Sequence, residues 1–130
     1  MVDALHQAHW AVRPGGTVID LRPDSDHQPR LVRGRQGVGG LYEQPRAVAD
    51  SHFSDRAVAR VVREGLLKPI RSGHFWYSLP PMDLPTLDGW LAESRRLGGY
   101  TRGTHALLAR DPDRPIVVRR ALKYGIYERL

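Results

Sequence analysis

The sequence Arg13-Pro14-Gly15-Gly16 constrains the fold of this chain more than any other stretch. Pro14 disfavours helical geometry at the residue before it, and the two glycines can adopt the positive φ of a helix C-cap and a tight turn. A helix must therefore end here. The residues that follow, 17–22, are short and β-branched and are closed by Pro23, which is typical of a buried strand.

A helix is expected ahead of this turn, over residues 2–12. Leu5, Ala8 and Val12 lie at offsets of three and seven residues, which places them on one apolar stripe of a helix. The chain thus begins with a helix, a forced turn and a strand. Every later element has to pack on this beginning.

This helix, turn and strand resemble the start of the second half of a class I S-adenosylmethionine-dependent methyltransferase. In that family a Leu-Arg-Pro-Gly-Gly turn leads from a crossover helix into the fifth strand of a Rossmann-like sheet, and residues 12–16 followed by 17–21 are similar to it. The resemblance covers residues 3–24 closely and the rest in the order of elements. It implies an α/β fold: one domain over residues 1–130, with a mixed sheet and flanking helices, like the C-terminal half of such an enzyme.

The resemblance also implies where the cofactor would bind. The family uses its first half, through an acidic-x-Gly-x-Gly-x-Gly loop after strand one and an acidic residue at the end of strand two that grips the ribose. Residues 1–130 correspond to the part after both features. We therefore expect no cofactor on this chain alone, and S-adenosylmethionine only if a missing half is supplied.

Two functions remain open at this point. The first is a methyltransferase-related protein that is inactive alone, as a truncated paralogue, a mis-started gene product or one part of a split enzyme whose protein partner supplies the missing half. The second is a non-enzymatic module that binds a protein or nucleic-acid partner. No catalytic residue is identified, because the chain has no Gly-x-Ser-x-Gly elbow to support a triad.

Composition narrows the class of protein further. With 41% apolar and 26% charged residues in 130, the chain is ordinary globular material, and the absence of cysteine excludes disulfides and thiolate chemistry. No apolar run approaches about 18 residues, so no membrane contact and a cytoplasmic location are expected. The net charge of +6 favours acidic partners, but the charge is spread along the chain. Any binding of nucleic acid should be weak and non-specific.

The remaining elements are predicted from the periodicity of apolar residues and from the glycine, proline and polar residues that separate the periodic runs. We expect a hairpin within 31–42, a helix opened by Ser54, an aromatic strand over 67–79, a helix capped by Asp83, a short helix over 104–110 and a last strand over 116–127.

The first strand carries three of the candidate site residues. In open α/β sheets ligands bind beyond the carboxyl ends of the strands, so Arg22 and Asp24 would face a substrate. Asp20 lies inside the strand, where an unpaired charge is costly. It is therefore either a functional carboxylate or the partner of Arg22 on the same face, and the ion pair is favoured.

The aromatic strand carries the other three. In the resembled family the walls of the substrate site come from segments around and after strand five, which would include His74, Trp76 and Tyr77. A packed aromatic core is the alternative, and it needs no ligand. His6 and His9 are one helical turn apart, but nothing else in the sequence demands a third ligand, so no metal is predicted.

A homo-oligomer is the last expectation. Half of a Rossmann-like sheet keeps a strand that once had a neighbour, here residues 17–22, and such apolar edges are not left open to water. Symmetric pairing of two copies is the commonest solution. The segments 74–77 and 117–127 are the other surfaces expected in that contact.

Overall fold

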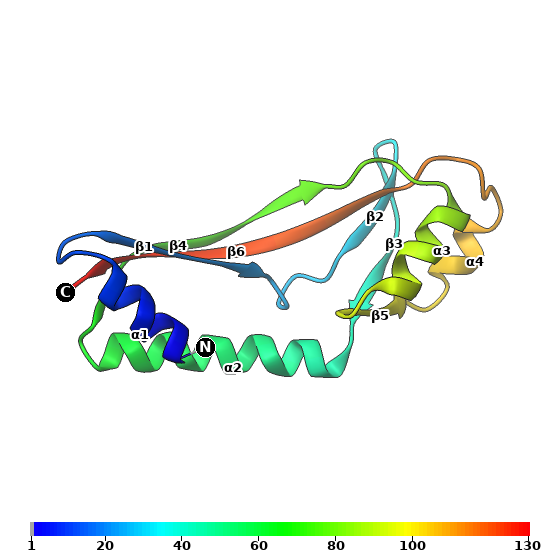
Figure 1. The fold of residues 1–130 in the computed structure, drawn as a ribbon. Coiled ribbons are helices and arrows are strands. Elements are labelled where there is room, and N and C mark those ends of the chain that lie inside the picture. Colours follow the sequence, from blue (N-terminus) through cyan, green and yellow to red (C-terminus); the bar gives the residue numbers. More distant parts are fainter. Residues whose placement is uncertain (1) are drawn as a thin grey trace. The chain divides into compact units, whose positions relative to one another are not determined.

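The structure, a computed structural model, describes residues 2–130 (Figure 1). Its elements are α1 (Val2–Ala11), β1 (Thr17–Pro23), β2 (Arg30–Arg33), β3 (Gln36–Glu43), α2 (Pro45–Arg63), β4 (Leu67–Ser78), α3 (Leu84–Glu93), β5 (Leu97–Tyr100), α4 (Thr104–Leu108) and β6 (Val117–Arg129). The chain divides into two compact units. The first comprises residues 2–23, 49–75 and 122–130, and the second comprises residues 24–48 and 76–121.

The first unit consists of two helices and three strands. Strand β1 pairs antiparallel with β6, from Thr17 opposite Glu128 to Pro23 opposite Leu122, and β4 pairs with β6 as well. The strand order is therefore β1, β6, β4. The helices cover one face of this sheet, where the core consists of Leu5, Val18, Ala57, Val58, Val61 and Leu67.

Strand β1 is buried on one face only. Val18 packs in the core, whereas Ile19 is 66% exposed and Leu21 is 55% exposed. Successive side chains of a strand point to opposite faces, so these two residues lie on the face away from the core. The sequence predicted a strand here correctly, but it indicated a buried strand, whereas residues 2–130 leave one apolar face of β1 uncovered.

The turn before β1 has the predicted geometry. Gly15 has a φ of 79°, and the backbone N–H of Gly16 donates to the Arg13 carbonyl over 2.9 Å. A Cβ on Gly16 would clash with the Val12 side chain and approach that carbonyl oxygen to 2.9 Å. Both glycines are thus required, one by its dihedral angle and one by the close approach of the helix end.

The second unit is built on the β2–β3 hairpin. The turn at Gly34, with a φ of 61°, joins the two strands, and β2 pairs on its other edge with the first part of β6. Strand β3 pairs in turn with β5. The core of this unit consists of Leu31, Val38, Leu41, Leu84, Leu87, Leu97, Leu108, Ile116 and Val118.

Strand β5 was missed at the sequence level, because Gly98 and Gly99 suggest a helix end and a turn. The structure gives these glycines a different role. The Tyr42 ring lies directly over Gly98, so that any Cβ there would clash with it. Glycine in this strand therefore marks the close approach of a neighbouring aromatic ring.

The sheet corrects one part of the predicted fold. The α/β class with flanking helices is confirmed, but the paired strands are antiparallel rather than mixed. Helix α2 does provide a crossover from β1 to β4. However, β6 runs back between these two strands, so they are not neighbours and no parallel pair forms.

The start of α2 is a second correction. The helix begins at Pro45, not at Ser54, which lies well inside it. Proline is well suited to the first position of a helix, where its missing N–H would have no partner. The helix after Asp83 is confirmed, since the Asp83 side chain accepts a hydrogen bond from the Thr86 N–H over 2.9 Å. Within residues 2–130, no helix is both long enough and apolar enough to cross a membrane.

Candidate functional site

A cavity of about 650 Å³ lies in the first unit, between α2 and the strands of its sheet. This cavity has two chemically different parts. The polar part carries charged side chains of β1, α2 and β6: Asp20, Arg22, Asp55 and Lys123. The rest of the wall is mainly apolar and aromatic, with Val58, Ala59, Val62, Pro69, Ile70, Tyr124 and Tyr127.

The charged side chains form one continuous network. The Nε of Arg22 donates to both carboxylate oxygens of Asp20, over 2.9 and 3.1 Å, and its terminal nitrogen donates to Asp55 over 2.8 Å. Lys123 donates to the other oxygen of Asp55, also over 2.8 Å. Each carboxylate is thus matched by a cation, and the network has no excess charge of its own.

Strand register places these groups together. Asp20 lies opposite Gly125 and Arg22 lies opposite Lys123 in the β1–β6 pair. Asp20 and Arg22 are two residues apart, so they share the face of the sheet that carries Val18. That face is the one covered by α2, which contributes Asp55.

Interactions within the network shift the pKa values of two of its members, Asp55 and Arg22. Burial disfavours the charge on Asp55, but hydrogen bonds from Lys123 and Arg22 outweigh this effect and hold the pKa of the carboxyl below its usual range. Burial likewise disfavours the charge on Arg22, and its bonds to Asp55 and Asp20 nevertheless raise its pKa. Both groups are therefore charged at neutral pH.

Tyr127 links the two parts of the cavity. Its ring lies against Gly125, where an added Cβ would come within 2.5 Å of the phenol oxygen. Burial and the charge of Asp20 raise the pKa of this phenol. Tyr127 therefore keeps its proton at neutral pH, and its hydroxyl is a hydrogen-bond donor beside the apolar wall.

Two further arginines line the cavity without belonging to the network. Arg63 lies in the last turn of α2, and Arg71 lies on β4. Neither has an acidic partner among residues 2–130. The lining therefore carries an excess of positive charge, which attracts anions.

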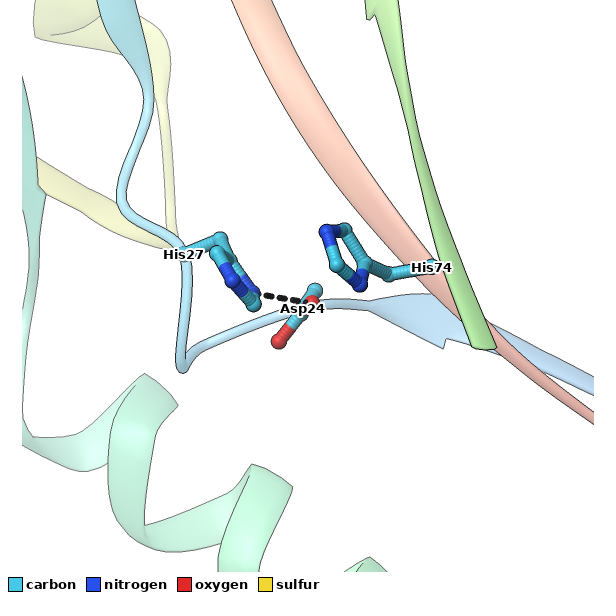
Figure 2. A group of neighbouring side chains, drawn as sticks. All are labelled: Asp24, His27 and His74. Atoms are coloured by element: carbon cyan, nitrogen blue, oxygen red, sulfur yellow. Dashed lines mark hydrogen bonds and ion pairs between the residues drawn. The ribbon is translucent and has the colours of Figure 1, made fainter. Parts of the chain in front are cut away.

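Of the predicted site residues, Asp20 and Arg22 lie in this cavity and form the predicted ion pair, which is confirmed. Asp24 belongs to the second unit and is only 4% exposed. It accepts a hydrogen bond from the Asp26 N–H and pairs with Nδ1 of His27 over 2.7 Å (Figure 2). His74, the third side chain drawn in Figure 2, is an exposed residue of β4 in the first unit.

Trp76 and Tyr77 also belong to the second unit, and both are half-buried. The guanidinium of Arg30 lies 4.7 Å from the centre of the Trp76 ring and that of Arg119 lies 6.0 Å from it. These are cation–π contacts with a stabilising role. A role of Asp24, His74, Trp76 or Tyr77 in binding stays a prediction, and none of them lines the cavity.

Sequence reasoning missed Asp55, Lys123 and Tyr127 as site residues. Asp55 directly follows Ser54, where the sequence suggested a helix start, and the helix actually begins earlier. Lys123 and Tyr127 lie on the predicted last strand, for which no site residue was predicted. Lys123, Gly125 and Tyr127 alternate along β6 and therefore share one face of the strand. This pattern could show which face meets Asp20 only once the partner strand and its register were known.

Comparison of this chain with protein-family models, with curated proteins and with solved structures finds no match.

We expect Asp55→Asn to make the stability of the protein less dependent on acid pH. The folded-state pKa of Asp55 lies below the unfolded value, so the carboxylate stabilises the fold above about pH 4, and this contribution is lost as pH falls through the folded pKa. Urea unfolding at a series of pH values measures the effect. Asp50→Asn, an exposed change on the same helix, is the control and should leave the acid dependence unaltered. The prediction would be contradicted if the unfolding free energy depended on acid pH equally in the natural sequence, Asp55→Asn and Asp50→Asn.

Proposed function

We propose that residues 2–130 provide the C-terminal half of a Rossmann-like methyltransferase and act by completing a half that binds the cofactor. One observation carries this proposal. The first unit runs α1, Arg-Pro-Gly-Gly turn, β1, α2, β4 and β6, with β6 antiparallel between β1 and β4. The order of helix, Arg-Pro-Gly-Gly turn and strand is the one that opens the second half of the resembled family.

The free edge of β1 supports the same proposal. This strand pairs with β6 on one edge and has no neighbour on the other among residues 2–130. Its exposed Ile19 and Leu21 add an apolar surface beside that edge. Natural proteins cover such edges, and a strand of the cofactor half would do so here.

The described residues do not by themselves fit S-adenosylmethionine. Within residues 2–130, the glycine-rich run Gly37 to Gly40 lies inside β3 and pairs with β2 instead of leading from a strand into a helix. A Cβ on Gly39 would clash with Thr104, so this glycine serves packing. No methyl-transfer step is therefore assigned to residues of this chain.

Isothermal titration with S-adenosylmethionine tests the proposal. The chain of residues 1–130 should give no saturable heat at micromolar cofactor. The same titration is then made on a longer chain that includes whatever the genomic reading frame encodes upstream, or on a complex with a neighbouring gene product that carries an acidic-x-Gly-x-Gly-x-Gly loop. Saturable binding by either of these supports the proposal.

Two outcomes would overturn it. One is saturable cofactor binding by residues 1–130 alone. The other is the absence of such a loop both upstream and in neighbouring genes. A second copy of the chain, which the sequence predicts, is the competing occupant of the β1 edge. Light scattering distinguishes it, because an edge reserved for a different half leaves a mass near 14.7 kDa.

A further inference from the structure

We propose that the cavity of the first unit binds a small organic monocarboxylate with an aromatic or branched apolar body. This inference is independent of the methyltransferase proposal, because it needs neither the cofactor nor a second half. It rests on the size of the cavity, on its two-part lining and on Arg63 and Arg71, which line the cavity but take no part in the charged network.

The volume of the cavity and its apolar wall determine which kind of apolar ligand body would fit. A volume of about 650 Å³ lies in the range of pockets that enclose small organic molecules. Val58 and Val62 line one side of the cavity from α2, and Ile70 lines the other side from β4. The Ile70 side chain is 55% exposed, so much of it is in contact with water. An apolar ligand body would remove the exposed part of Ile70 from water.

The ring of Tyr127 on β6 adds shape to this wall. Tyr127 lies opposite Val18 and therefore on the covered face of the sheet, and a Cβ on Gly125 would come within 2.5 Å of its phenol oxygen. The ring is thus held by neighbouring backbone. A ring held in this way favours a planar or branched body over a long flexible chain, because less ordering accompanies binding.

The charges fix the head group. Asp20 and Asp55 are already matched by Arg22 and Lys123, whereas Arg63 and Arg71 have no acidic partner in the part of the chain that the structure describes. An anion is therefore attracted and a cation is repelled. A guanidinium also presents a planar pair of donors that matches a carboxylate.

The same acids argue against a more highly charged ligand. A dianion such as a phosphate monoester would meet the two carboxylates of Asp20 and Asp55 in the same cavity. A monocarboxylate meets half of that repulsion and still engages one arginine fully. The geometry thus selects a singly charged head on an apolar body.

Calorimetric titration with 2-naphthoate and with its neutral amide, 2-naphthamide, tests this inference. We expect saturable binding of 2-naphthoate with a Kd below about 1 mM and binding of the amide at least about tenfold weaker. Arg63→Gln with Arg71→Gln should weaken 2-naphthoate at least about tenfold and leave the amide unchanged within about twofold. Arg56→Gln removes a charge from the same helix outside this cavity and should change neither.

A filling variant locates the site. Ala59 lines the cavity and is exposed on α2, so Ala59→Phe should fold normally, as judged by circular dichroism, and should abolish binding of 2-naphthoate. The inference is overturned if 2-naphthoate does not saturate, if acid and amide bind equally well, if Arg56→Gln weakens binding as much as the double variant, or if folded Ala59→Phe binds as the natural sequence does.

Discussion

Replacing Arg33 with methionine is expected to lower the free energy of unfolding by roughly 3 to 5 kcal/mol. Arg33 lies on β2 and is only 6% exposed. One of its terminal nitrogens donates to the carbonyls of Leu108, Asp111 and Arg114 over 3.3, 2.6 and 3.1 Å. Methionine fills a similar volume but donates no hydrogen bond, so it leaves these carbonyls without their charged donor.

Urea unfolding of matched variants measures this loss. Arg35→Met changes an exposed arginine in the turn of the same hairpin and should stay within about 0.5 kcal/mol of the natural sequence. A free energy of unfolding for Arg33→Met within about 1 kcal/mol of that control would show that water replaces the guanidinium at these carbonyls.

The second large effect is expected for Arg22→Met, at roughly 2 to 4 kcal/mol of unfolding free energy. The side chain of Asp20 is only 11% exposed, and Arg22 supplies both of the hydrogen bonds to it. Without Arg22 this carboxylate is left charged and partly desolvated. Asp55 is less affected, because it keeps its bond to Lys123.

A double-mutant comparison separates the ion pair from general packing. Asp20→Asn combined with Arg22→Met removes the stranded charge and should recover part of the loss that Arg22→Met causes alone. Lys123→Met is the matched control and should cost about 1 kcal/mol or less, since Asp55 then keeps Arg22. Additive losses in the double variant would contradict the pairing of Asp20 with Arg22.

Several elements could be predicted because their signals are local. Pro14 and Gly15 end α1 through their dihedral angles, and Asp83 caps α3 by accepting a hydrogen bond from a residue three positions away. The alternation of β1 placed Asp20 and Arg22 on one face, which is why their ion pair could be anticipated. None of these features depends on distant parts of the chain.

The two errors have different origins. The start of α2 was misplaced because Ser54 suits a helix N-terminus locally, although the helix already runs from Pro45, a competing local signal. Strand β5 was missed because its glycines are explained only by Tyr42, which lies far away in the sequence. Only in the second case is the deciding interaction absent from the local sequence.

The amino-acid sequence alone was enough to locate most helices and strands, to indicate the α/β class and to single out Asp20 and Arg22. It could not determine that β6 runs back between β1 and β4, since strand pairing depends on contacts between residues about a hundred positions apart. That pairing brings Lys123 and Tyr127 to the face of Asp20. The cavity and its charged network therefore exist only in the tertiary structure, because strand register decides which side chains share a face.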